Sequence, residues 1–283
     1  MNSPMQAPTP APMPASLHGP LSSRLFGALA ALLLLLSVLA WAYGTQLSAL
    51  LPHNAHGHAH MHAHGHPFVD ARSLWRIPNA ADVLSNAAFL IPGLLGLLAL
   101  RALRNGPLAP LLRRSLALFF VGLWLVALGS GIYHWAPSAW GLALDRLGMA
   151  VAFAGLLTAA TAERLDERAA RWMLALSLPL ALAAAVLPAV NGNVLPWALV
   201  QGGGMLWLLT LALLRRPGPQ AAGISLLAVL AWYALAKLLE SADAAVFAAT
   251  GELVSGHTLK HLAAAAAAWP AVAALRRVSG LTR

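Results

Sequence analysis

Blocks of about 20 apolar residues recur along this chain and restrict its possible folds more than any other feature, because that length crosses a bilayer as a helix. Only 10% of the 283 residues are charged, whereas soluble domains have about a quarter. The sequence therefore predicts an all-α integral membrane protein. We expect eight spans, at residues 25–45, 82–100, 115–135, 141–161, 172–190, 194–214, 220–240 and 256–275.

The arginines between these blocks orient the chain, since the cytoplasmic loops of membrane proteins carry the excess of positive charge. With eight spans, one side of the membrane holds only Arg72 and Arg76. The other side holds the remaining arginines of the loops and tails: Arg24, Arg101, Arg104, Arg113, Arg114, Arg164, Arg168, Arg171, Arg215, Arg216, Arg276, Arg277 and Arg283. We therefore expect both termini in the cytoplasm. The net charge of +9 has this origin and does not indicate nucleic-acid binding.

The block boundaries divide the chain into five segments. We expect a disordered cytoplasmic tail at 1–23, an N-terminal signal-anchor helix at 24–45 and a His-rich extracytoplasmic loop at 46–67. A seven-helix core follows at 68–278, and a cytoplasmic tail at 279–283. Ala40-Trp41-Ala42 resembles a signal-peptide cleavage site, but the long region before the first block favours an uncleaved anchor.

The His-rich loop has an alternating pattern that binds transition metals loosely. Two interpretations stay open: a loop that collects zinc for a site elsewhere, or a low-complexity linker with incidental metal affinity. Its histidines are at positions 53, 56, 58, 60, 62, 64 and 66. The chain has no cysteine, which excludes disulfides and thiolate metal sites.

Ionisable residues inside membrane spans are costly and indicate functional sites. The third span ends with Ser130 and His134, the fourth begins with Asp145, and the eighth begins with His257 and His261. In the expected topology all of these residues lie near the outer ends of their spans. Three helices are therefore expected to bring polar groups to the same depth.

The spacing of these residues is suited to a metal ion. His257 and His261 are four residues apart, so they share one helix face and can hold one ion between them. A third ligand from His134 would complete a His₃ site with an open position, which is typical of catalytic zinc. Ser130 lies one helical turn from His134, and Asp145 is suited to orienting or deprotonating a water molecule beside the metal.

Each residue also has a simpler interpretation. For the histidine pair the alternative is an interfacial position, for His134 an aromatic belt with Trp135, and for Ser130 a hydrogen bond to its own helix backbone. For Asp145 the alternative is a local ion pair with Arg146. Their shared depth favours the metal site over these separate interpretations.

Other charged residues lie in the last two expected spans and in one loop. Lys260 either faces the site, as a second-shell or substrate-binding group, or extends to the outer surface, which we expect. Lys237 and Glu240 are three residues apart and are expected to form a structural pair. Glu163 belongs to a mixed-charge loop with Asp166 and Glu167, which predicts a solvated face.

Taken in order, Ser130-x-x-x-His134, Asp145 and His257-x-x-x-His261 resemble the signature of the CREST superfamily of membrane hydrolases. That superfamily contains alkaline ceramidases and the progestin and adipoQ receptors. The stretch IPNAADVLSNAAFLIPG at 77–93, with Ser85 and Asn86, is similar to the first core helix of the ceramidase branch. The resemblance covers residues 68–278 and implies a seven-transmembrane-helix ceramidase-like core with an additional N-terminal transmembrane helix.

The resemblance implies a zinc-dependent amide hydrolase that acts on a ceramide-like N-acyl lipid from the bilayer. His134, His257 and His261 would hold one catalytic Zn²⁺. Asp145 would act on the water molecule, and Ser130 would donate a hydrogen bond to the oxyanion or the water. Ser85, Asn86 and Lys260 are possible second-shell or substrate residues.

The sequence departs from the family before the first core helix. Eukaryotic alkaline ceramidases bind calcium there through an acidic segment, whereas this chain has only Asp70 and Asp82, with two arginines between them. We therefore expect no calcium site, and Asp70 is the weak candidate ligand. The Ala-, Leu- and Arg-rich composition is typical of a high-GC bacterium, so we expect the bacterial inner membrane, a site near its extracytoplasmic side and an N-acyl lipid other than ceramide.

Two functions outside hydrolysis are alternatives. One is a receptor-like or scaffold protein of the same fold with structural zinc. The other is a metal-homeostasis or transport protein, suggested by the His-rich loop. Asp145 and Ser130 favour hydrolysis over the first alternative, and the clustering of ionisable residues near one face disfavours the second.

Overall fold

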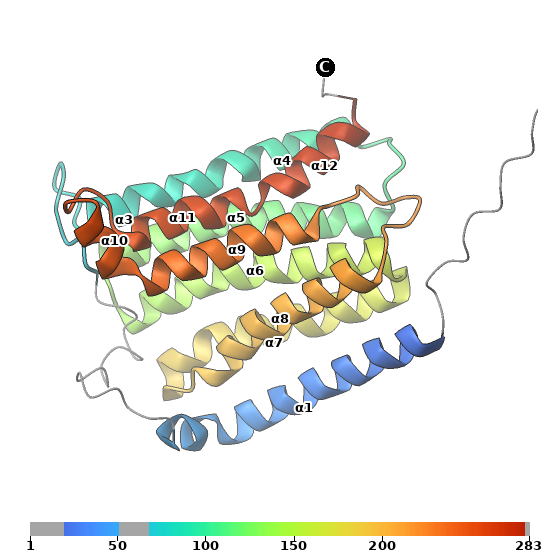
Figure 1. The fold of residues 1–283 in the computed structure, drawn as a ribbon, viewed down its shortest axis with the longest axis horizontal. Helices are drawn as coiled ribbons and strands as arrows, with labels where there is room; N and C mark the ends of the chain where they lie inside the picture. Colours follow the sequence, from blue (N-terminus) through green and yellow to red (C-terminus); the bar gives the residue numbers. More distant parts are fainter. Residues whose placement is uncertain (1–19, 51–67, 281–283) are drawn as a thin grey trace, which may run out of the picture.

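The computed structural model describes residues 20–50 and 68–280, which form helices and no strand. In chain order these are α1 (Pro20–Leu50), α3 (Ala80–Ser85), η2 (Asn86–Phe89), α4 (Leu90–Ala102), α5 (Pro110–Trp135), α6 (Ala139–Arg164), α7 (Glu167–Asn191), α8 (Leu195–Leu214), α9 (Leu226–Ser241), α10 (Asp243–Ala249), α11 (Gly256–Ala266) and α12 (Trp269–Val278). The long helices lie side by side as a bundle (Figure 1). The histidines of the predicted loop at 46–67 lie outside the described residues, and so does most of the predicted tail at 1–23.

The all-helical prediction is confirmed, and six helical segments of the described chain are long and apolar enough to cross a membrane. The predicted count of eight spans is not confirmed. α9 has only 16 residues, and the last predicted span is divided into α11 and α12. Pro270 stands in the first turn of α12, where its missing N–H costs nothing, but it cannot continue α11.

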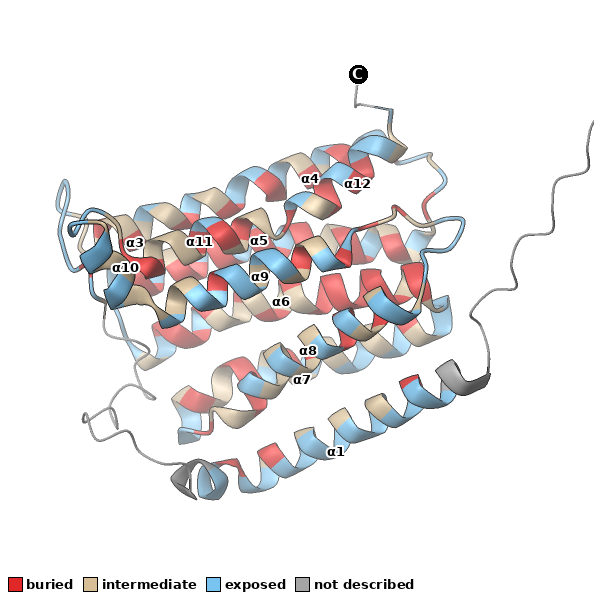
Figure 2. Cartoon of the chain, in the orientation of Figure 1, coloured by how far each residue is buried: buried red, intermediate tan, exposed pale blue. Residues whose placement is uncertain are grey.

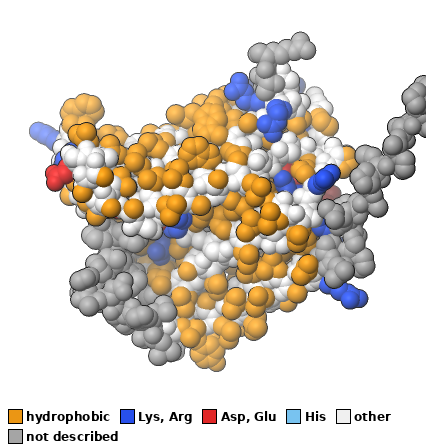
Figure 3. Space-filling view, in the orientation of Figure 1, with side chains coloured by type: hydrophobic (Ala, Val, Ile, Leu, Met, Phe, Trp, Pro, Cys, Tyr) orange, Lys and Arg blue, Asp and Glu red, His pale blue; other side chains and the backbone are white. Residues whose placement is uncertain are grey.

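The surface of the bundle is compatible with contact with lipid. Figure 3 shows hydrophobic side chains over most of one face, with Lys and Arg gathered mainly toward the end where α1 begins and α12 ends. Large apolar side chains on α1, such as Leu35 and Val38, are more than half exposed. In lipid these side chains are favourable, whereas in water they would form an aggregation-prone surface.

Helices α5 and α6 form the centre of the bundle, and Figure 2 shows buried residues along both. Glycines seven residues apart let their backbones touch: Gly122 and Gly129 on α5 face α6, and Gly148 and Gly155 on α6 face α5. A Cβ at Gly129 would lie 2.5 Å from the Leu144 carbonyl oxygen. Small residues at such spacing allow close packing of membrane helices. The contact places the C-terminal half of α5 directly against the start of α6.

The C-terminal end of α6 is tied to the segment before α9 by a buried carboxylate. Glu163 accepts hydrogen bonds from the backbone N–H groups of Ala222, Gly223 and Ile224, at 2.9, 3.1 and 3.2 Å. It also pairs with Arg164 at 2.8 Å. The prediction of a solvated face is therefore wrong for Glu163, because the loop before α9 folds over it and supplies its donors.

Helix α1 is the least buried of the long helices and packs mainly on α8. Its contacts include an aromatic pair and a hydrogen bond. The Phe26 ring lies 5.5 Å from the Trp207 ring, edge to face, and Asn193 Nδ2 donates to the Ala40 carbonyl at 2.8 Å. The helix therefore lies at the edge of the bundle, away from its centre (Figure 1).

We expect the α5–α6 contact to be sensitive to a single methyl group. Gly129→Ala should lower the melting temperature of the detergent-solubilised protein, with a cost on the order of 1–3 kcal/mol, because the added Cβ meets the α6 backbone. The control is Gly131→Ala on the same helix, where a Cβ meets nothing within 4 Å. Equal melting temperatures for the two variants would contradict the inferred close contact.

Candidate metal centre

Three buried histidines from two helices meet at the end of the bundle where α5 ends and α11 begins. His134 is in the last turn of α5, and His257 and His261 are in the first two turns of α11. Their ligating nitrogens all lie within 4.8 Å of one another. His134 Nε2 is 3.3 Å from His257 Nε2. The convergence predicted from sequence is therefore present in the structure.

The donor set and its spacing fit a transition metal ion. Two nitrogens that bind one tetrahedral zinc at about 2.0–2.1 Å are separated by roughly 3.3–3.4 Å. The nitrogens of His134 and His257 have this separation. Imidazole donors suit zinc, copper, iron or nickel, whereas calcium and magnesium require oxygen ligands. In the part of the chain that the structure describes, this is the one group of three His, Cys, Asp or Glu residues close enough to hold a metal ion. All three of its members are histidines.

The orientation of His261 is set by Ser85. Ser85 Oγ lies 2.7 Å from His261 Nδ1, across the contact between α3 and α11. A hydrogen bond at Nδ1 leaves Nε2 directed at the other two rings, and such partners hold metal-binding histidines in position. Ser85 therefore lies against one of the three histidines. Asn86 does not face the histidines; its Nδ2 donates to the Asp82 carbonyl at 2.7 Å.

The start of α11 is held by carboxylates that the sequence analysis did not assign to the site. Asp243 Oδ1 accepts the His257 backbone N–H at 2.7 Å. Asp82 Oδ1 accepts the hydroxyl of Thr258 at 2.7 Å and that of Ser255 at 3.4 Å. These bonds fix the first turn of α11, and with it the direction of both histidines. The available signal was the Ser-x-x-Thr start of a helix beside buried acidic residues.

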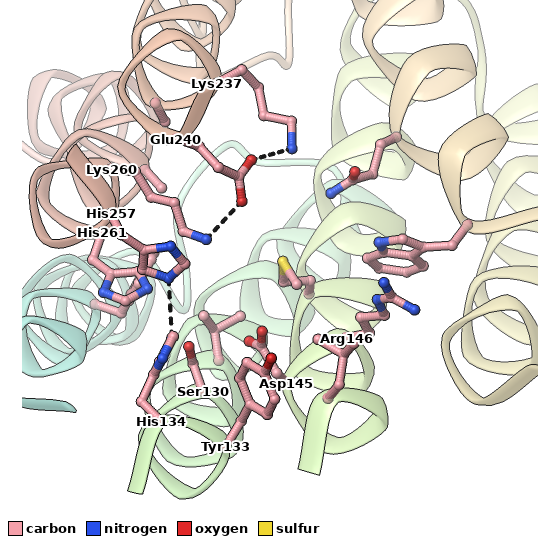
Figure 4. A pocket seen from close by; sticks show the side chains of 18 of the residues that line it. Ser130, Tyr133, His134, Asp145, Arg146, Lys237, Glu240, His257, Lys260 and His261 are labelled. Carbon is pink, nitrogen blue, oxygen red and sulfur yellow. Dashed lines mark hydrogen bonds and ion pairs between the residues drawn. The ribbon is translucent and has the colours of Figure 1, made fainter. Parts of the chain in front are cut away.

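Asp145 and Ser130 lie beside the histidines, on the opposing helices α6 and α5 (Figure 4). The Ser130 hydroxyl is within hydrogen-bonding reach of the Asp145 carboxylate, and both side chains are buried. The alternative of an Asp145–Arg146 ion pair is not supported: no ion pair within 4.0 Å joins them in the described chain, and the Arg146 guanidinium lies over the Trp197 ring at 5.9 Å.

A cavity of about 350 Å³ adjoins the histidines. Its lining includes Ser130, Asp145 and all three histidines, together with apolar side chains such as Phe89 and Met149. The histidine cluster is thus open on one side to a space large enough for a small molecule or part of a lipid. A structural zinc site would be closed by a fourth protein ligand.

The position of Lys260 differs from the prediction. It does not extend to the outer surface; its Nζ donates to Glu240 Oε1 at 2.7 Å, and its side chain is 20% exposed. Glu240 also pairs with Lys237 at 2.5 Å, so the predicted Lys237–Glu240 pair is confirmed and extended to three residues. All three line the cavity (Figure 4). Gly256 makes this possible, because a Cβ there would collide with the Leu239 carbonyl oxygen of α9.

Asp70, the weak candidate for a calcium ligand, forms an ion pair with Arg72. Arg72 donates to both carboxylate oxygens at 2.7 Å, and these bonds hold the pKa of Asp70 below its usual range. Arg72 also donates to the Leu253 carbonyl at 2.9 Å. The pair therefore fastens the segment before α3 to the loop before α11.

No family model, curated protein or solved structure matches this chain.

We expect the purified protein to bind about one transition metal ion per chain through the three histidines. The measurement is metal content by mass spectrometry after dialysis, in a variant that lacks residues 53–66, so that the loop histidines do not contribute. His261→Ala should lose the ion, because two imidazoles hold it too weakly to survive dialysis. An unchanged metal content in His261→Ala would contradict this site.

Ser85→Ala should weaken metal binding by about 10- to 100-fold without abolishing it, because His261 loses the group that orients it. Competition with a chelator of known affinity measures the change. Ser177→Ala is the control, since this hydroxyl lies on α7, outside the centre. Equal affinities for the two variants would exclude the orienting role.

Proposed function

We propose that this chain is an intramembrane zinc-dependent hydrolase that cleaves the amide bond of an N-acyl lipid. The observation that carries the proposal is the joint lining of one cavity by three buried histidines, Asp145 and Ser130. The amide bond and the lipid come from the resemblance of these residues and their order to the ceramidase branch of the CREST superfamily.

A zinc ion held by the histidines would polarise the amide carbonyl and lower the pKa of a water molecule toward 7. Asp145, which lines the cavity, would accept a proton from the attacking water and deliver it to the leaving amine nitrogen. Water adds to the carbonyl carbon, the carbon–nitrogen bond breaks, and a fatty acid and an amine are released. Ser130, which also lines the cavity, would donate a hydrogen bond to the oxyanion, which is worth about 3 kcal/mol for one such donor.

The membrane setting supports a lipid substrate. The cavity lies among helices whose outer faces carry apolar side chains, and its own wall is partly apolar. A substrate with long acyl chains would keep them in this apolar surrounding while its amide reaches the histidines. The same setting disfavours a water-soluble substrate, which would have to leave water to enter.

We also propose eight membrane passes, with α9 and the α11–α12 pair as the last two, and both termini in the cytoplasm of a bacterium. Two observations support this topology: the described chain begins and ends at the same end of the bundle, and that end carries most of the arginines (Figures 1 and 3). The histidines then lie near the extracytoplasmic side.

We expect Asp145→Asn to retain the metal ion and to lose hydrolysis by about 100-fold or more, because the amide side chain cannot accept the proton. The measurement is the release of fatty acid from N-acyl sphingoid lipids and related lipid amides in vesicles, followed by mass spectrometry. Glu167→Gln is the control. This carboxylate is exposed, pairs with Arg171 and lies at the start of α7, at the opposite end of α6 from Asp145. Wild-type protein that holds the metal but cleaves no lipid amide would favour the receptor-like or scaffold alternative.

A further inference from the structure

The cavity has a charged wall beside the histidines, formed by Arg146, Lys237, Glu240 and Lys260 (Figure 4). We call these four residues the cationic wall. With Asp145, the cavity is lined by three cations and two carboxylates, so positive charge is in excess. Charged groups at this depth in a membrane protein are costly and are retained where they bind something.

The two lysines are neutralised only in part. Glu240 Oε1 accepts from Lys260 and Glu240 Oε2 accepts from Lys237, so a single carboxylate serves two ammonium groups. Each carboxylate oxygen is thereby occupied. The arrangement holds both ammonium groups at the cavity and leaves them with one negative charge between them.

Arg146 contributes the second observation. Within residues 20–50 and 68–280 it makes no hydrogen bond or ion pair, and its Nη1 is buried. The Tyr233 hydroxyl, which lines the same cavity, is also buried and has no hydrogen-bond partner in this part of the chain. An unpaired guanidinium presents a planar fork of donors that matches a carboxylate or phosphate.

We propose that the cationic wall binds an anionic group, a carboxylate or phosphate, on the amine portion of the lipid substrate. The inference rests on the proposed function and narrows its substrate class from N-acyl lipids in general to acidic ones. Arg146, Asp145 and the histidines line one cavity, so an anion held by this guanidinium keeps the substrate amide in the space that Asp145 and the histidines share. The acyl chain then lies along the apolar part of the lining, which includes Val126 and Met149.

The test compares substrates that differ only in this charge. An N-acyl amino acid and its methyl ester, and an N-acyl sphingoid base and its 1-phosphate, are supplied to the full-length metal-loaded protein in phosphatidylcholine nanodiscs. We expect kcat/KM for the acidic member of each pair to exceed that of the neutral member by tenfold or more. The difference should lie mainly in KM, because the wall acts on binding.

The variants Arg146→Gln and Lys237→Gln test whether the cationic wall causes the preference for the acidic lipid. Each should reduce the preference for the acidic lipid at least fivefold, through a loss of kcat/KM for the acidic lipid. Lys237 is half exposed, so this variant keeps the test decisive if Arg146→Gln fails to fold. Arg171→Gln is the matched control, since it removes an exposed cation far from the cavity.

Binding without turnover separates this inference from the proposed function. In the Asp145→Asn background, a fluorescent N-acyl amino acid should bind at least tenfold more tightly than its methyl ester. Selective binding with no hydrolysis by the wild type would contradict the proposed function and support the anion site. Hydrolysis with equal kcat/KM for both members of each pair would overturn the anion site and keep the proposed function. Displacement of the fluorescent lipid by equimolar inorganic phosphate would also overturn it, because the site would then bind free anions instead of a lipid head group.

Discussion

The contact between α5 and α6 is the interaction on which the rest of the structure depends. Its glycines remove side chains from the interface, so that Gly129 meets the backbone of Leu144 and Gly148 meets that of Leu125. Ser130 and His134 are thereby brought against Asp145. In a bilayer, where lipid is as apolar as the helices themselves, such close packing is a main source of helix association. The candidate site is built on this rigid pair, and α11 adds the other two histidines.

Buried carboxylates set the remaining geometry. Glu163 holds the loop before α9, Asp82 and Asp243 hold the start of α11, and Glu240 joins α9 to α11 through Lys260. In a medium of low dielectric constant an unpaired charge is expensive, so each carboxylate binds donors from another segment. Because these bonds are few and specific, they fix the rotation of α11 about its axis and therefore the direction of His257 and His261.

Much of the fold and the site could be predicted from the sequence, for physical reasons. A bilayer demands apolar blocks of a given length, which identified the helices, and intramembrane histidines indicated the site. The divided last helix was missed, although Pro270 was visible, because a proline can either kink a helix or end it. The buried state of Glu163 was missed because its donors are backbone groups, which leave no sequence pattern.

The sequence by itself determined which residues share a helix face: His257 with His261, Ser130 with His134, and Lys237 with Glu240, since helical periodicity requires no other part of the chain. Only the tertiary structure decided what those faces meet. Lys260 turns to Glu240, Arg146 turns away from Asp145 toward Trp197, and Ser85 reaches His261. These outcomes depend on how each helix is rotated and how closely it packs on its neighbours, and such quantities come from contacts between residues far apart in the chain.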